Sequence, residues 1–99
     1  MPDKSLSPIF SLEKTSLFEK RLAKILKKNG NLENKVIKSL ETLAENPQYP
    51  SLKSHQVNSP SFGKVWSLWV HGDLRIFWQY EGDKIIILLL GICSHDEVY

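Results

Sequence analysis

His95, Arg75 and Tyr99 carry side chains that could act together on a nucleic-acid phosphate. Histidine changes charge near neutral pH, so His95 could give or take a proton. The planar guanidinium of Arg75 fits a phosphate group, and the ring of Tyr99 could stack on a base, an interaction worth roughly 1–3 kcal/mol. A plainer interpretation stays open for each: a surface histidine, an arginine paired with Asp73 or Asp96, and a tyrosine packed on the sheet.

The other histidines and the cysteine are weaker candidates for chemistry. His55 lies in a loop segment, LKSH, and loop histidines are common; His71 stands beside a turn glycine and is expected to be structural or solvent-facing. Three histidines at scattered spacing give no metal-ligand signature. Cys93 is the single cysteine, which excludes an internal disulfide and a cysteine-cluster metal site. We therefore expect neither a metal nor another cofactor.

The basic residues are distributed unevenly along the chain. The net charge is only +2, but residues 13–28 hold six basic and two acidic side chains, whereas residues 73–99 hold two basic and five acidic ones. This asymmetry predicts a basic face that could meet phosphate. On charge alone, an ordinary solvated helix face explains it equally well.

Two helices are predicted in the first half of the chain. SLFE at residues 16–19 fits a capping box for the first helix, and Asn29-Gly30 is expected to end it, with Gly30 in the left-handed conformation. Asn31 can cap the second helix, and Asn46-Pro47 ends it because a residue before proline avoids the helical region. The short break between the two predicts an antiparallel helical hairpin.

The second half of the chain predicts strands. Three segments rich in β-forming residues are separated by glycine-containing turns, at residues 64–70, 74–80 and 84–91. The last is an unbroken apolar run, as expected for a central strand covered on both faces. Residues 9–12 and 52–57 could add short strands. The sequence thus predicts a single α+β domain, residues 1–99, in which an N-terminal antiparallel two-helix hairpin packs on a mainly antiparallel sheet of three or four strands.

The predicted turn at Gly72 and Asp73 fixes which side chains share a face. A two-residue loop there pairs His71 with Leu74, and continuing the register pairs Trp69 with Ile76 and Ser67 with Trp78 on the helix-covered face. The open face would then carry Trp66, Leu68, Val70, Arg75, Phe77 and Gln79. So apolar a face predicts a protein partner.

Nothing in the sequence predicts export or membrane insertion. Residues 1–16 are polar and lack the apolar core of a signal peptide. The longest apolar run, Ile85 to Leu90, is far too short to span a bilayer. We expect a soluble, cytoplasmic protein.

Taken in order and spacing, these features resemble the RelE/ParE superfamily of bacterial toxins from type II toxin–antitoxin systems. The resemblance runs from about Phe18 to Tyr99 and rests on the two-helix opening, the NP stop, LKSH, GDLRIFWQY, the apolar strand and the ending SHDEVY. It implies a RelE-like fold and a ribosome-dependent mRNA endonuclease of the RelE or YafQ kind. Such enzymes work without a metal: the ribose 2′-hydroxyl attacks the adjacent phosphate, helped by a base, an acid and phosphate-stabilising cations.

The resemblance assigns roles residue by residue. Arg75 corresponds to the arginine that contacts the scissile phosphate, and Asp73 to an acidic position before the same strand. His55 corresponds to a YafQ-type active-site histidine, His95 to the C-terminal catalytic position, and Tyr99 to the terminal aromatic that contacts the substrate. Seven basic residues are expected to hold RNA phosphates by charge: Lys20, Arg21, Lys24, Lys27, Lys28, Lys53 and Lys64.

The chain also departs from the family pattern. RelE-like toxins have lysines on the strand before the arginine, where this chain has Trp66 and Leu68, and a YafQ-like histidine position holds Trp69. Some cationic stabilisation is therefore missing, which leaves two alternatives open: a ParE-like toxin that inhibits DNA gyrase without cutting RNA, or a degenerate toxin homologue. The implied partners are an acidic, partly disordered cognate antitoxin, mRNA and the ribosome, and no membrane.

Overall fold

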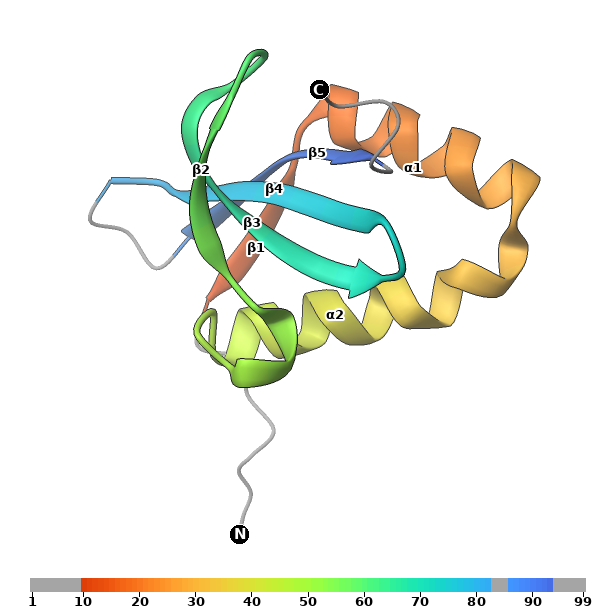
Figure 1. The fold of residues 1–99 in the computed structure, drawn as a ribbon, viewed down its shortest axis with the longest axis horizontal. Coiled ribbons are helices and arrows are strands. Elements are labelled where there is room, and N and C mark those ends of the chain that lie inside the picture. The colour runs from red at the N-terminus through yellow and green to blue at the C-terminus, as the bar shows by residue number, and fades with distance from the viewer. Residues whose placement is uncertain (1–9, 83–85, 94–99) are drawn as a thin grey trace, which may run out of the picture.

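Two helices cover one face of a five-stranded sheet in the computed structural model, which describes residues 10–82 and 86–93 (Figure 1). The elements in chain order are β1 (Ser11–Lys14), α1 (Ser16–Lys28), the 3-10 turn η1 (Gly30–Leu32), α2 (Glu33–Glu45), the 3-10 turn η2 (Pro50–Leu52), β2 (His55–Ser59), β3 (Gly63–His71), β4 (Leu74–Tyr80) and β5 (Ile86–Cys93). The predicted α+β class is confirmed. Neither helix in the described ranges is long and apolar enough to cross a membrane.

The sheet is mixed, with the strand order β1-β5-β4-β3-β2. β2 to β5 pair antiparallel, while β1 runs parallel to the first half of β5, from Ser11 beside Ile86 to Lys14 beside Leu89. The prediction of a mainly antiparallel sheet is confirmed, but the count of three or four strands is wrong. The two edge strands, SLEK and HQVNS, overlap the segments at residues 9–12 and 52–57 that the sequence offered as optional short strands. Both are short and polar, as edge strands often are, so neither shows hydrophobic alternation.

The helices do not form the predicted hairpin. α1 packs along β5, whereas α2 packs against β3 and η2, and each helix contacts the intervening turn η1 more than it contacts the other helix. Figure 1 shows them spreading apart from that turn across the sheet. Each helix therefore buries its apolar stripe on the sheet. The prediction of two consecutive helices is correct, but the prediction that they pack against each other is wrong.

Two predicted helix caps are wrong. Thr15, not Ser16, caps α1: its hydroxyl accepts the Phe18 N–H at 3.1 Å and donates to the Leu89 carbonyl of β5 at 2.9 Å. Asn31 lies inside η1, and α2 begins after Leu32 with no side-chain cap. Thr15 takes the cap position because its hydroxyl also bonds to β5. Local sequence does not predict that long-range bond.

The end of α2 agrees with the prediction, whereas the end of α1 differs from it in the conformation of Gly30. α1 ends at Asn29, whose N–H reaches the Ile25 carbonyl, and Gly30 opens η1 without the expected positive φ. α2 ends at Asn46 as predicted, with its N–H bonded to the Thr42 carbonyl at 2.8 Å. The proline that follows Asn46 excludes a longer helix.

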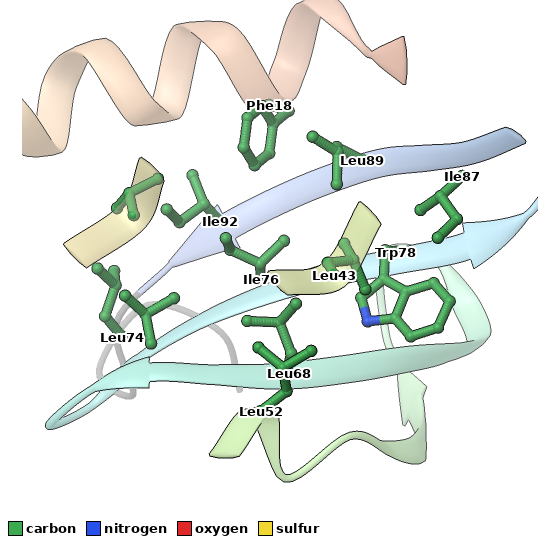
Figure 2. Close-up of a cluster of buried hydrophobic side chains, with 12 residues drawn as sticks. Phe18, Leu43, Leu52, Leu68, Leu74, Ile76, Trp78, Ile87, Leu89 and Ile92 are labelled. Atoms are coloured by element: carbon green, nitrogen blue, oxygen red, sulfur yellow. The ribbon is translucent and has the colours of Figure 1, made fainter. Parts of the chain in front are cut away.

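The main core lies between the helices and the sheet. Figure 2 shows Phe18 of α1 above Leu89 and Ile92, with Leu43 of α2 close to Trp78. All five of these side chains are fully buried. Each contributes roughly 1.5–3 kcal/mol through its removal from water, so this face of the sheet is committed to packing.

A β-bulge between Trp69 and His71 changes the predicted register. His71 pairs with Leu74 as predicted, but beyond the bulge the pairs are Trp69 with Arg75, Leu68 with Ile76, Ser67 with Phe77 and Trp66 with Trp78. The predicted pairs of Trp69 and Ser67 are wrong by one residue. An extra residue on one strand shifts every later side chain to the other face.

The bulge also corrects the predicted faces. Trp66, Leu68 and Val70 belong to the helix-side core, where Trp66 stacks on Trp78 with ring centroids 5.5 Å apart. Ser67 and Trp69 take their place on the opposite face. The predicted open face is therefore wrong for Trp66, Leu68 and Val70, whereas Phe77 lies outside the helix-side core as predicted.

Replacing Thr15 by alanine is expected to lower the free energy of unfolding by about 1–2 kcal/mol, because the helix cap and the bond to β5 are both lost. Ser16→Ala is the matched control: the residue is exposed and caps nothing, so we expect a change within about 0.5 kcal/mol. Urea unfolding followed by circular dichroism measures both variants. A larger loss for Ser16→Ala would contradict this cap.

Candidate functional site on the open face of the sheet

The face of the sheet opposite the helices, here called the open face, gathers polar and aromatic side chains in two adjacent rows. One row runs His55, Ser67, Phe77 and Gly91 across β2, β3, β4 and β5. The next row runs Trp69 and Arg75 across β3 and β4. Residues directly opposite one another share a face. The fold therefore places His55 and Arg75, predicted from distant parts of the sequence, on one face.

His55 is held in one tautomer by the backbone beside it. Its side chain is exposed, and its Nδ1 lies 3.0 Å from the Lys53 carbonyl oxygen. A carbonyl only accepts hydrogen bonds, so Nδ1 must carry the hydrogen. In the neutral ring, Nε2 is then the nitrogen with a free lone pair, and it can accept a proton from a substrate.

Arg75 and Asp73 lie at and near the β3–β4 turn. Arg75 is half-buried in β4 beside Trp69, and the structure gives no ion pair between it and Asp73. Asp73 is exposed in the turn, next to Gly72 with φ +55°. Aspartate is a common turn residue, so its turn role accounts for its position without invoking chemistry.

Gly91 and Phe62 shape the β5 side of the open face, and sequence reasoning missed both. A Cβ on Gly91 would lie 2.9 Å from the Phe62 Cζ and 3.9 Å from Arg21 Nη1. The Phe62 ring also packs against Phe77, with centroids 5.9 Å apart. A glycine inside an apolar strand often marks such a close approach, which was the available signal. Arg21 thus reaches from α1 to the edge of the open face.

The predicted phosphate-binding residues fall into three places. The five on α1, spaced at 100° per residue, fall within an arc of about 120°: Lys20, Arg21, Lys24, Lys27 and Lys28. Arg21, Lys24 and Lys28 line a hollow of about 240 Å³. Lys53 lies over the Trp69 ring on the open face. Lys64 shares a strand face with Trp66, so it is not brought to the open face.

The remaining predicted site residues, His95 and Tyr99, lie outside the described residues. The described part of β5 ends at Cys93, opposite Arg75. Within the ranges that the structure describes, no group of three or more histidine, cysteine, aspartate or glutamate side chains could hold a metal ion. Trp66 and Leu68, taken from the sequence as substituting for family lysines, point into the core instead; Ser67 and Trp69 occupy the open face of that strand.

Comparison with solved structures identifies the fold. A conserved hypothetical protein from Helicobacter pylori is 30% identical, with 89% of this chain and 97% of that chain covered and a TM-score of 0.56. A metal-bound toxin from Helicobacter pylori is 29% identical, with 91% and 99% covered and a TM-score of 0.63. The chain has the fold of the RelE/ParE superfamily of toxins.

A third structure extends the comparison within the RelE/ParE superfamily. YafQ from E. coli is 22% identical, with 88% of this chain and 94% of that chain covered and a TM-score of 0.66, which shows the shared fold. No protein-family model and no curated protein matches the sequence. The structural neighbours include toxins of type II toxin–antitoxin systems, and their length matches that of this single domain.

Adding a methyl group at Gly91 is expected to displace Phe62 from the open face. Gly91→Ala should lower the free energy of unfolding by about 1–3 kcal/mol, because the new Cβ overlaps the ring. Gly30→Ala is the control, since nothing lies within 4 Å of its Cβ position. In a double-mutant cycle, Phe62→Ala should absorb most of the Gly91→Ala effect; additive losses would show that the two residues do not touch.

Proposed function

We propose that this protein is the toxin of a type II toxin–antitoxin system and that it cuts mRNA on the ribosome without a metal ion, thereby blocking translation. The observation that carries the proposal is that one face of the sheet holds both a proton acceptor, the exposed His55, and a cation, the half-buried Arg75. His55 presents Nε2 there, and Arg75 stands in the neighbouring row. The structural likeness to YafQ and the sequence resemblance to RelE and YafQ enzymes support the same assignment.

The reaction that this arrangement suits is an internal phosphoryl transfer. His55 Nε2 takes the proton of the ribose 2′-hydroxyl, whose oxygen attacks the adjacent phosphorus. Arg75 stabilises the negative charge that builds on the phosphoryl oxygens. The bond to the 5′-oxygen breaks, leaving a 2′,3′-cyclic phosphate. From the family resemblance, we assign protonation of the leaving oxygen to His95 and orientation of the RNA to Tyr99. Asp73, in the β3–β4 turn, is assigned as a further catalytic residue on the same grounds.

The basic arc of α1 gives the toxin a way to bind the ribosome. One of its five cations, Arg21, extends from α1 toward Gly91 at the edge of the open face. Contacts of this kind with RNA phosphates are independent of sequence and weaken as salt rises. We infer that α1 faces ribosomal RNA while the open face receives mRNA, which places the activity in the cytoplasm.

A cognate antitoxin is the second proposed partner. One solved structure with this fold, RelBE2 from Mycobacterium tuberculosis, is a toxin–antitoxin complex. A groove of about 600 Å³ lies between β1 and α2, lined by four apolar residues, Leu12, Ile37, Leu40 and Ala44, and three charged ones, Lys14, Glu41 and Glu45. Ile37 is 45% exposed, and among the described residues β1 has no strand on the side away from β5. A partly disordered antitoxin that orders on binding could cover both features.

The alternative function is a ParE-like toxin that inhibits DNA gyrase. It is favoured by the uncharged side chains, Ser67 and Trp69, that β3 presents beside Arg75. The two functions differ in what happens to mRNA. Mapping mRNA ends after brief expression separates them: cuts at ribosomal A-site codons support the nuclease, whereas intact mRNA with blocked gyrase supercoiling supports the alternative.

Arg75→Ala and His55→Ala are each expected to lower the rate of mRNA cleavage by at least about 100-fold, because each removes a cation or a proton acceptor from the reacting atoms. Growth arrest should be relieved in parallel. Primer extension on ribosome-bound mRNA measures the cleavage rate. Lys64→Ala is the matched control, because it removes a basic side chain that lies away from the open face.

These variants must keep their fold for the comparison to hold. Both positions are on the open face and outside the helix-side core, so their free energies of unfolding should stay near that of the wild type. Cleavage at the wild-type rate by folded Arg75→Ala, or an equal loss in Lys64→Ala, would contradict the assignment of the open face.

Reversing one charge on α1 is expected to weaken ribosome binding more than reversing one elsewhere. Lys24→Glu should reduce affinity and make the dependence on salt less steep, because a phosphate contact is lost. Lys64→Glu makes the same charge change outside the arc and serves as the control. Binding to ribosomes at several salt concentrations measures both; equal losses would show that net charge, and not the α1 face, governs binding.

A further inference from the structure

Trp69 holds a cation on the open face. Its Nε1–H donates to the Gly72 carbonyl at 2.9 Å, which fixes the orientation of the indole. The Lys53 ammonium then lies over the ring, with Nζ 4.8 Å from the centroid. A cation at this distance is attracted by the negative face of the ring. The contact thereby favours one position of the long lysine side chain before any ligand arrives.

The backbone of Lys53 is also held in place. It adopts a left-handed conformation, φ 52° and ψ 42°, at the end of η2, with its N–H bonded to the Pro50 carbonyl at 3.1 Å. Lysine rarely takes this conformation, and such strain persists only where surrounding contacts maintain it. The carbonyl of the same residue orients His55. One residue therefore connects the indole of Trp69 with the proposed proton acceptor.

The register places this cation close to Arg75. Trp69 and Arg75 are directly opposite in β3 and β4, so their Cβ atoms are about 4.5–5.5 Å apart. Lys53 approaches the indole from the β2 side and Arg75 stands on the β4 side. An anion lying over the Trp69 edge would meet both positive charges.

We propose that Trp69 is a positioning residue that seats the Lys53 ammonium on the open face, where Lys53 and Arg75 together bind a phosphate of the RNA backbone. The inference deepens the proposed function and rests on it for the identity of the ligand. Because the Lys53 side chain is already held over the ring, it loses less conformational entropy on binding phosphate than a free lysine would. It also assigns Trp69 a role other than base stacking, because Lys53 already covers the ring.

The contact that holds the Lys53 ammonium over the Trp69 ring, here called the seat, can be tested without RNA. Protons of the Lys53 side chain next to Nζ should resonate upfield of those of other lysines, because they lie over an aromatic ring. Trp69→Leu should return them to the ordinary position, and Trp69→Phe should retain part of the shift. Ordinary shifts in the wild-type protein would overturn the proposal.

Phosphate binding is tested with a short 2′-O-methyl RNA oligonucleotide, which cannot be cut because the attacking hydroxyl is blocked. Lys53→Met and Trp69→Leu are each expected to weaken binding about tenfold at low salt. Each should lower the slope of log affinity against log salt by about one. Lys53→Arg should restore the slope, and the double variant should be no worse than the poorer single one. Lys64→Met is the control.

Two outcomes separate this inference from the proposed function. If the oligonucleotide binds as described but mRNA is never cut, the nuclease assignment fails and the seat stands. If mRNA is cut and Lys53→Met changes neither binding nor salt slope, the seat fails and the nuclease assignment stands. Weaker binding by Trp69→Leu with unchanged binding by Lys53→Met would overturn the proposal in favour of base stacking. Trp69→Phe gives the same test if Trp69→Leu does not fold.

Discussion

The extra residue in β3 between Trp69 and His71 is the constraint on which the rest of the structure depends. It lets Leu68 and Val70 both serve the helix-side core while Trp69 stands beside Arg75 on the open face. Without the bulge, the alternation of β3 would bury Trp69 and expose Leu68. One local irregularity therefore gives β3 a well-packed core face and sets Trp69 beside Arg75 on the other face.

Sequence periodicity was enough to predict the α+β class, the order of helices and central strands, and the end of α2 at Asn46. It could not predict features that depend on distant partners. Thr15 caps α1 because its hydroxyl also reaches Leu89 of β5, and β1 exists because β5 offers a parallel edge. The helices separate because each packs its apolar residues against the sheet. The bulge itself leaves no mark in a run such as KVWSLWV.

In the candidate site too, the sequence identified some residues, whereas others depend on contacts between distant parts of the chain. His55 and Arg75 were identified from the sequence by their chemistry and by family resemblance, and the sheet register gives them a shared face. Phe62, Gly91 and the contact of Lys53 with Trp69 were not identified, since they depend on a turn and a loop folding back over the sheet. The sequence comparison placed the missing family lysines at Trp66 and Leu68. The bulge puts both of these residues in the core, so neither position could present a cation on the open face.

The central claim is that the open face cuts RNA through the ribose 2′-hydroxyl. The most direct measurement uses reconstituted ribosomes programmed with two mRNAs that differ only by one 2′-deoxynucleotide at the mapped cut. The account predicts that the protein cuts the all-ribose mRNA and leaves the 2′-deoxy mRNA whole. Equal cutting of both, or cutting of neither, would contradict it.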